Sequence, residues 1–363
     1  MFLEEVKRGK QGKNQGLPTG LAKLDRAIDG LQKKSIYGIA AGPKVGKTTL
    51  TDYAFVLNPI LHALENNIPV SYIYFSYEID RKKKEFDFAA FFLYYDYGIT
   101  HFKHKDKEYP ISSRYLMSRM KDEEDEAIII QEEHENLLKI IYENRIIPLI
   151  GEYDKNDKKI KDGVIDFLDF RENPTGMRNY LIDKAKKKGK FVYEKFTINE
   201  NGKTVQKSYP TSYIPDNPAE YVVVITDHLR KLKRERGYSM KQNVDKWIEY
   251  TVELRNICAY SFVHIIHLNR GISNVDRLKY NGEFVYPTGD DVKDTGNLSE
   301  ECDYLITMMN PADEKYGLKK HFGVELHTVE NYRSIHLVES RDTECPMHLQ
   351  AQIVGNQKYF NQL

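Results

Sequence analysis

Short runs of β-branched and aromatic residues alternate along the chain with longer amphipathic segments. Several of the short runs are apolar at consecutive positions, which is typical of strands in a sheet that is covered on both faces. These runs predict strands at 35–40, 70–78, 145–151, 221–227, 261–268, 304–309 and 334–340. The amphipathic segments predict helices at 47–66, 81–97, 122–144, 175–188 and 241–259. The alternation predicts an α/β fold built on a doubly wound, mostly parallel sheet.

Three segments interrupt this alternation. Residues 1–16 are polar and rich in Lys and Gly, so we expect an N-terminal arm or linker that leads into one domain over 17–363. Residues 98–121 are polar and loop-like. Two alternating runs within about 190–218 are joined by Asn-Glu-Asn-Gly, which predicts a β-hairpin with an Asn-Gly turn. Because this hairpin directly precedes the predicted strand at 221–227, we expect it to be an insertion into the core fold.

Composition limits the classes of function. Lys+Arg and Asp+Glu balance at 54 each, so any binding of nucleic acid must depend on local patches rather than on net charge. The three cysteines, Cys258, Cys302 and Cys345, are too far apart for a zinc site and odd in number for a disulfide framework. No stretch approaches the roughly 18 apolar residues of a membrane helix, and the N-terminus lacks the apolar core of a signal peptide. We expect a cytoplasmic protein with no membrane contact.

The strongest chemical signal is AAGPKVGKTT at residues 40–49, which follows a predicted strand and opens a predicted helix. This is the context of a phosphate-binding P-loop, in which backbone N–H groups and the helix N-terminus together hold an anion. Gly46 lets the backbone approach phosphate, Lys47 can reach the β- and γ-phosphates, and Thr48 can bind Mg²⁺. The residues expected to surround the phosphates are Ala41, Gly42, Pro43, Lys44, Val45, Gly46, Lys47, Thr48 and Thr49. The loop predicts ATP and Mg²⁺ as ligands, and the alternative is a glycine-rich turn that binds another anion.

A carboxylate that helps Thr48 to hold the Mg²⁺ ion is expected at the end of another buried strand. Asp227 ends the run YVVVITD, and a carboxylate at the tip of a central strand can hold Mg²⁺ through water. The alternative is an ordinary aspartate in a turn after a strand.

Several segments in order resemble the motor domain of the DnaB-like replicative helicases, the C-terminal RecA-like ATPase domain of that family. The resemblance covers about 16–363, and the inserted 190–218 segment has no counterpart in it. The segments that carry it are 16–50 with the P-loop, SYEID (76–80), ITDHLRKLK (225–233), HLNR (267–270), DVKDTGNLSEECDYLI (291–306) and ESRDTECPMHLQ (339–350).

This resemblance implies a role for three further side chains. Glu78 corresponds to the glutamate that orients or deprotonates the attacking water. His267 stands where the family usually has Gln, and it would bond the γ-phosphate and report its loss. Arg341 corresponds to the arginine finger that reaches the ATP of a neighbouring subunit. The family usually has Lys two positions before this arginine, whereas this chain has Glu339. The alternatives are an edge-facing charge, a structural histidine and a surface arginine.

Two loops are candidates for contact with DNA. The segment 230–243 follows the strand that ends at Asp227 and contributes Arg230, Lys231, Lys233 and Arg234. The loop 291–297 resembles the family's strand-gripping loop, in which Lys293 would pair with a phosphate and Gly296 would present a backbone N–H. A run of basic residues is also typical of a solvated face.

Taken together, the sequence predicts an ATP- and Mg²⁺-dependent DNA helicase or translocase that acts as a homohexameric ring on single-stranded DNA. A primase or a helicase loader is the expected partner. The few residues before the resemblance, the histidine at 267 and the insertion favour a phage-type member. The alternatives are a RecA-like recombination or repair ATPase that forms filaments on DNA, and a non-motor ATPase that drives assembly.

Overall fold

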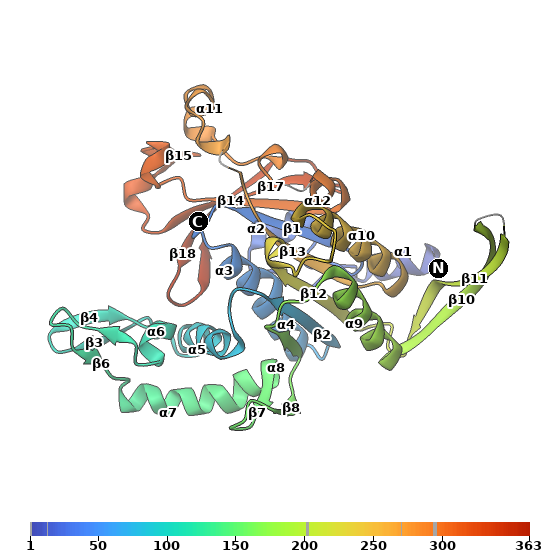
Figure 1. Cartoon of the computed structure of the whole chain (residues 1–363). Coiled ribbons are helices and arrows are strands. Elements are labelled where there is room, and N and C mark those ends of the chain that lie inside the picture. The colour runs from blue at the N-terminus through green and yellow to red at the C-terminus, as the bar shows by residue number, and fades with distance from the viewer. Residues whose placement is uncertain (1, 13, 201–202, 270, 293–295) are drawn as a thin grey trace.

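A nine-stranded sheet runs through the protein in the order β19-β18-β17-β14-β1-β13-β12-β2-β9 (Figure 1). The computed structural model describes residues 2–12, 14–200, 203–269, 271–292 and 296–363. The strands of the sheet are β1 (Ile36–Ala41), β2 (Val70–Ser76), β9 (Ile165–Leu168), β12 (Tyr221–Asp227), β13 (Ser261–His267), β14 (Tyr304–Met309), β17 (Tyr332–Ser340), β18 (Met347–Val354) and β19 (Tyr359–Gln362). Strands β14, β1, β13, β12, β2 and β9 pair in parallel, and β17, β18 and β19 extend the sheet antiparallel. The predicted doubly wound, mostly parallel sheet is confirmed.

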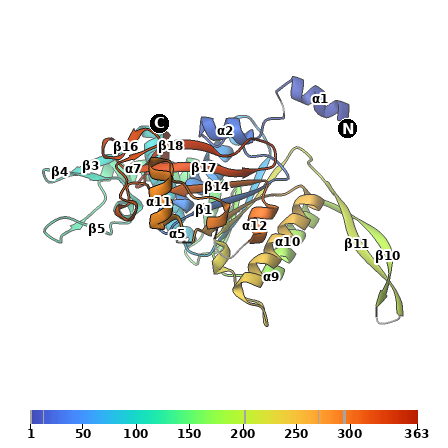
Figure 2. The ribbon, with the colours of Figure 1, turned by 90° about the horizontal axis from the view of Figure 1, so that it is seen from above.

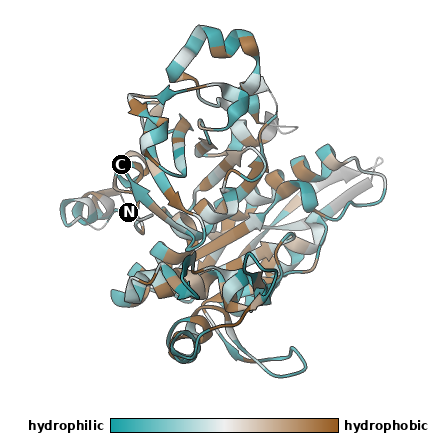
Figure 3. Ribbon diagram, turned by 90° about the vertical axis from the view of Figure 1, so that its left-hand side faces the viewer, coloured by the Kyte–Doolittle hydropathy of each residue, from teal (hydrophilic) through white to brown (hydrophobic). Residues whose placement is uncertain are grey.

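Helices cover both faces of this sheet because alternate residues of its strands point to opposite sides. The covering helices are α2 (Ala22–Ile28), α3 (Lys47–Thr51), a π-helical stretch (Asp52–Leu57), α4 (Asn58–Glu65), α5 (Arg81–Tyr97), α7 (Glu132–Ile141), α9 (Pro174–Lys187), α10 (Met240–Cys258) and α12 (Gly296–Glu301). Within β1, Tyr37 and Ile39 belong to the core beneath α3–α5, whereas Ile36 and Ala40 belong to the core beneath α9, α10 and α12. Figure 2 shows α9, α10 and α12 together on one side and α2 on the other. Apolar residues concentrate in the central strands (Figure 3).

Among the described residues, the helices are too short or too polar to span a membrane.

Smaller helices and hairpins lie around this core. The remaining helices are α1 (Phe2–Lys10), α6 (Ser113–Leu116), α8 (Ile147–Ile150) and α11 (Val275–Asn281). The short hairpins are β3 (His101–His104) with β4 (Lys107–Pro110), β5 (Met120–Lys121) with β6 (Ala127–Ile128), β7 (Gly151–Tyr153) with β8 (Lys159–Asp162), and β15 (Lys320–His321) with β16 (Val324–Glu325).

The structure corrects the sequence interpretation between 98 and 168. The strand predicted at 145–151 is wrong, because these residues continue helix α7 through a π-helical stretch into α8. A short apolar run cannot by itself distinguish the buried end of a helix from a buried strand. The edge strand of the sheet is β9 instead. The helix predicted from 122 begins only at Glu132, since its acidic first part forms the β5–β6 hairpin, and the loop predicted at 98–121 contains β3, β4 and α6.

The alternating runs before β12 form the hairpin that their pattern predicts. Strands β10 (Gly189–Glu200) and β11 (Lys203–Pro215) pair antiparallel along their length and extend away from the body of the protein (Figure 1). The predicted Asn-Gly turn at 201–202 lies outside the described residues. Within the segment expected to be an arm or linker, α1 is an exposed helix.

A fully buried ion pair lies between α5 and the helix that follows the P-loop. The ammonium of Lys84 donates to Asp52 Oδ2 at 2.7 Å and to Tyr74 Oη at 3.1 Å. Tyr74 in turn donates to Asp52 Oδ1 at 2.9 Å, which closes a triangle of three buried polar groups. Burial raises the pKa of Asp52, and the neighbouring ammonium opposes that rise. Each group therefore depends on the other two, because an unpaired charge in an apolar interior is costly.

We expect Lys84→Met to lower the free energy of unfolding by about 3–5 kcal/mol, because it leaves the Asp52 carboxylate buried without its cation. The double variant Asp52→Leu/Lys84→Met should lose less than Lys84→Met alone, since no charge is then left unpaired. Urea denaturation measures both variants. Lys82→Met, on the exposed side of the same helix, is the control and should change stability by no more than about 0.5 kcal/mol. A loss below about 1 kcal/mol for Lys84→Met would show that the pair is not needed.

Candidate functional site

The P-loop joins the end of β1 to the start of α3. Its last residue, Gly46, has a φ of 115°, which is a backbone conformation that favours glycine. A Cβ atom at Gly46 would also lie 2.9 Å from Ile353 Cδ1. The conformation therefore favours glycine at this position, whereas the contact could be relieved by a shift of the flexible end of Ile353. The loop opens a helix at Lys47, as the motif predicts.

Lys47 is held against the loop and against the end of β13. Its ammonium donates to the carbonyl of Gly42 at 3.0 Å and lies 3.1 Å from His267 Nδ1. An ammonium can only donate, so Nδ1 of His267 is the acceptor and the ring proton of the neutral imidazole is on Nε2. Burial lowers the pKa of Lys47 to about 8, while Asp227 and Glu78 oppose the shift. Burial and the cation of Lys47 lower the pKa of His267 to about 4. At neutral pH the pair is a charged lysine and a neutral histidine.

Thr48 and Asp227 meet beside this lysine. The Thr48 hydroxyl donates to Asp227 Oδ2 at 3.0 Å. The second carboxylate oxygen, Oδ1, is buried and has no hydrogen-bond partner among the described residues. Burial raises the pKa of Asp227 to about 6, with the nearby Lys84 opposing the shift. A hydroxyl beside a buried carboxylate with a free oxygen is a donor set that fits Mg²⁺ or its water ligands.

Glu78 lies just beyond the end of β2, next to the same group of residues. Its Oε1 atom is 3.1 Å from His228 Nε2 and 3.7 Å from the ammonium of Lys231. The backbone N–H of Arg230 donates to His228 Nδ1 at 3.2 Å, so the proton of the neutral ring is on Nε2 and is donated to Glu78. The side chain of Glu78 is 40% exposed and is therefore accessible to water. His228 fixes the direction in which this carboxylate points.

Arg341 lies at the opposite end of the parallel strands, beside their amino ends. Ser340 pairs with Tyr304 at the start of β14, and the backbone N–H of Arg341 donates to the backbone carbonyl of Asp303. The guanidinium donates to the carbonyls of Glu300 and Glu301 at the end of α12. At about 3.3 Å per residue, the length of β1 separates Arg341 from the P-loop of its own chain by roughly 17 Å or more. The structure therefore does not bring Arg341 to the site formed by Lys47, Thr48, Asp227, Glu78 and His267.

Glu339, two residues earlier, lies close to Gly289. Burial raises its pKa, and the neighbouring Asp290 raises it further.

The residues predicted to contact DNA are divided between two environments. Arg230 is partly buried and Lys231 lies against Glu78, so these two belong to the surroundings of the site. Lys233 and Arg234 are exposed in the loop before α10. Gly296 is the first residue of α12, and Lys293 lies outside the described residues.

Two residues at the site were not found from the sequence. His228 directly follows Asp227, but a histidine after a strand carries no signal until Glu78 is known to face it. Arg333, at the start of β17, donates from Nε to the carbonyl of Val45 in the P-loop at 2.7 Å. That contact joins positions 288 residues apart, and the local pattern around Arg333 contains nothing that indicates it.

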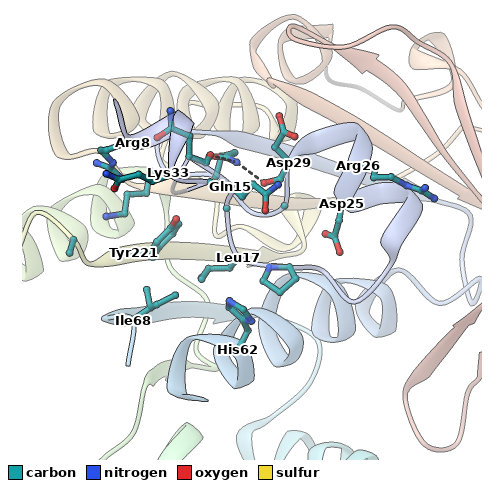
Figure 4. A pocket seen from close by; sticks show the side chains of 18 of the residues that line it. Arg8, Gln15, Leu17, Asp25, Arg26, Asp29, Lys33, His62, Ile68 and Tyr221 are labelled. Carbon is teal, nitrogen blue, oxygen red and sulfur yellow. Dashed lines mark hydrogen bonds between the residues drawn. The ribbon is translucent and has the colours of Figure 1, made fainter. Parts of the chain in front are cut away.

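A cavity of about 1350 Å³ lies near the amino ends of the parallel strands, between the N-terminal segment, α2 and the start of β12. Its lining includes Arg8, Asp25, Lys33, His62 and Tyr221 (Figure 4). The ammonium of Lys33 donates to the carbonyl of Pro218 and lies over the Tyr221 ring. None of the described residues that line this cavity belongs to the P-loop. The candidate site is therefore defined by the side chains around the P-loop and not by this larger cavity.

Comparison with known proteins supports this interpretation. The family model of the DnaB-like helicase C terminal domain matches residues 16–173. A solved ATPase domain superimposes with a TM-score of 0.65 at 14% sequence identity, covering 100% of this chain and 97% of that one. A DnaB-like replicative helicase, solved in a study of its interactions with primase, superimposes with a TM-score of 0.62 at 13% identity, covering 99% of this chain and 65% of that one. No curated protein sequence matches the chain.

At such low sequence identity, the two structural matches show the fold alone. The family model is a match of the sequence itself, over residues 16–173. The chain thus has the RecA-like P-loop ATPase fold, and over residues 16–173 it matches the DnaB-like helicase C terminal domain family that its sequence resembles.

Proposed function

We propose that this chain is an ATP- and Mg²⁺-dependent helicase motor of the DnaB-like type, which hydrolyses ATP between subunits and moves along single-stranded DNA. The convergence of Lys47, Thr48, Asp227 and Glu78 at the carboxyl edge of the parallel strands is the observation that carries this proposal. These are the groups that phosphoryl transfer to water requires: a cation for the phosphates, ligands for a metal and a carboxylate near the γ-phosphate. The domain would extend over 17–363, with the hairpin at about 190–218 as an insertion.

Each side chain at this edge has a defined task in the proposed reaction. Lys47 would exchange its bond to the Gly42 carbonyl for the β- and γ-phosphates, because an ammonium binds an anion more strongly than a neutral oxygen. Thr48 and Asp227 would hold Mg²⁺, which neutralises charge on the phosphates when it is bound. Glu78, oriented by the N–H of His228, would accept a hydrogen bond from the attacking water and align it. His267, released from Lys47, would then be free to bond the γ-phosphate.

The position of Arg341 supports assembly into a ring. An arginine at the amino edge of the sheet can stabilise charge at the carboxyl edge only of another copy. A head-to-tail contact between these two edges is heterologous, and a heterologous contact generates a closed ring when its rotation closes. A homohexamer on single-stranded DNA, with a primase or a helicase loader as partner, is the form that the DnaB-like resemblance favours. One of the similar structures was solved in a study of interactions with primase.

We expect Lys47→Ala to reduce ATP turnover by at least about 100-fold, because charge on the transferring phosphoryl group is no longer offset. Steady-state phosphate release measures the effect. Lys82→Ala, an exposed lysine of α5, is the matched control and should retain full turnover. Undiminished hydrolysis by Lys47→Ala would refute the site.

We expect Arg341→Ala to retain nucleotide binding and to lose about 10³-fold in turnover, the range observed for arginine fingers. Mixing Arg341→Ala with Lys47→Ala subunits should restore part of the activity, because some interfaces then combine an intact P-loop with an intact arginine. The readout is ATPase rate against mixing ratio at constant total protein. A rate that never exceeds the sum of the two variants alone would contradict a shared site.

We expect Lys233→Glu/Arg234→Glu to weaken binding to single-stranded DNA and to lower the slope of log affinity against log salt by about 1.4, as two lost phosphate contacts would. Lys231 is left unchanged because it also contacts Glu78. Lys186→Glu/Lys187→Glu, an equal charge reversal on α9, is the control. Fluorescence anisotropy across a salt series gives both slopes, and equal slopes for the two variants would exclude this loop from the DNA contact.

A further inference from the structure

The β10–β11 hairpin is anchored at its base and leaves the body of the protein at the amino ends of the parallel strands. It connects the end of α9 to the start of β12, which lies there. Phe191 and Tyr213 pack against the core beneath α9 and α10, and the Tyr213 hydroxyl donates to the carbonyl of Ala185 at 2.9 Å. At about 3.3 Å per residue, the 12 residues of β10 span roughly 40 Å when extended. The hairpin therefore reaches well beyond the body to which it is anchored (Figure 1).

The side of the hairpin that faces away from this anchor carries a row of exposed apolar side chains. Val192 and Phe196 alternate with the anchoring Phe191 along β10 and therefore lie on the opposite side from it. The register of the two strands adds Tyr209 and Ile214 of β11 to that side. All four side chains are exposed, Ile214 by 62%, and the rings of Phe196 and Tyr209 lie 6.2 Å apart. We call these four residues the outer face of the hairpin.

The composition of the hairpin indicates what kind of surface covers it. A two-stranded hairpin is marginally stable in water unless a further strand or another surface packs against it. Contiguous exposed apolar side chains mark interaction surfaces, and aromatic residues are enriched at the centres of protein interfaces. The hairpin is also basic, with four lysines and two glutamates between 189 and 215, and both Lys190 and Lys195 are exposed. We therefore expect a partner that offers an apolar side chain within an acidic surface.

A surface of this kind is present elsewhere on the same protein. Residues 122–135, which run from the β5–β6 turn into α7, contain eight carboxylates and no Lys or Arg. Among the described residues, four lysines of neighbouring segments pair with these carboxylates, and three of the carboxylates share the ammonium of Lys105. The negative charges therefore outnumber the lysines that pair with them. Ile129 lies in the middle of these residues and is 71% exposed. We call residues 122–135 the acidic segment.

The acidic segment lies near the carboxyl ends of the parallel strands. Strand β18 runs parallel to β14, because both pair antiparallel with β17, so the turn after β18 is at these ends. Gln357 in that turn donates to the carbonyls of Thr100 and Ile111, which flank the β3–β4 hairpin. Gln131 of the acidic segment donates to the carbonyl of Lys103 in β3 at 2.6 Å. The acidic segment and the β10–β11 hairpin therefore lie at opposite ends of the molecule (Figure 1).

We propose that the β10–β11 hairpin docks on the acidic segment of the next copy in the ring. A head-to-tail ring places the amino ends of the strands of one copy against the carboxyl ends of the next, and the two surfaces extend from these ends. The outer face packs against Ile129, and the long side chains of Lys190 and Lys195 reach the surrounding carboxylates. The inference rests on the proposed function for the head-to-tail arrangement, and it adds a contact between copies that lies outside the nucleotide site.

The test reverses the charges on each surface and then on both. Sedimentation velocity of the intact chain with Mg²⁺ and a non-hydrolysable ATP analogue gives the protein concentration at which half of the chains are in rings. We expect Lys190→Glu/Lys195→Glu to raise that concentration by at least about tenfold, and Glu132→Lys/Glu133→Lys to do the same, because like charges then face each other. A chain with all four substitutions should return to within about threefold of the unmodified chain, since opposite charges face each other again.

Two further variants separate docking from folding and from charge in general. Lys155→Glu/Lys158→Glu, an equal charge reversal in the exposed turn between β7 and β8, is the control and should leave assembly unchanged. Phe196→Ser/Ile214→Ser should weaken assembly as the charge reversals do, because it removes apolar side chains of the outer face. Its thermal melting curve, measured by circular dichroism below the assembly concentration, should match that of the unmodified chain, since both side chains are exposed.

The outcomes distinguish the ring from the hairpin contact. An unmodified chain that stays monomeric with the analogue would refute the ring of the proposed function and this contact with it. Rings that assemble equally well in all hairpin variants would overturn the hairpin contact alone. Weaker assembly without recovery in the fourfold variant would overturn the acidic segment as the docking surface. Hairpin variants that assemble normally but bind single-stranded DNA more weakly, measured by fluorescence anisotropy, would make the hairpin a DNA contact and likewise overturn the docking.

Discussion

The parallel pairing of β13, β1, β12 and β2 is the constraint on which the site depends. Strand β1 pairs with β13 so that Ala41 lies beside His267, and β12 pairs with β2 so that Asp227 lies beside Ser76. These four parallel strands therefore end at the same side of the sheet, and the residues that follow each of them meet there. Four separate parts of the sequence supply the P-loop, Glu78, Asp227 and His267. They become neighbours because parallel strands deliver their carboxyl ends to one place.

Burial then decides the protonation of the groups that meet. It lowers the pKa of His267 and of His228, so both rings are neutral donors and acceptors at neutral pH. It raises the pKa of Asp227, and the buried ammonium of Lys84 acts against that rise. The triangle of Lys84, Asp52 and Tyr74 thus has two consequences. It holds α5 to the helix after the P-loop, and it places a positive charge behind the carboxylate that is proposed to hold Mg²⁺.

The antiparallel strand β17, beside the parallel core, positions two arginines, Arg333 and Arg341. Strand β17 runs in the opposite direction to β14, so its start lies beside the P-loop and its end lies at the far edge. Arg333 and Arg341 are only eight positions apart in this strand and its continuation, yet they serve opposite ends of the molecule. One contacts the P-loop of its own chain. The other lies at the amino ends of the parallel strands, bonded to carbonyls at the end of α12, and is proposed to act on a second copy. A single strand thereby links the P-loop to the proposed interface between subunits.

The sequence by itself determined the P-loop, the parallel strands β1, β2, β12, β13 and β14, and the candidate residues Lys47, Thr48 and Asp227. These features depend on contiguous residues, because apolar runs, glycine positions and a strand-ending carboxylate are local patterns. Only the tertiary structure decided that 145–151 is helical, that β9 forms the edge of the sheet, and that His228 faces Glu78. The hydrogen bond from Arg333 to the carbonyl of Val45 was likewise visible only in the tertiary structure. The physical reason is that a buried helix end and a buried strand have the same composition, and that a contact between residues hundreds of positions apart exists only once the sheet has brought them together.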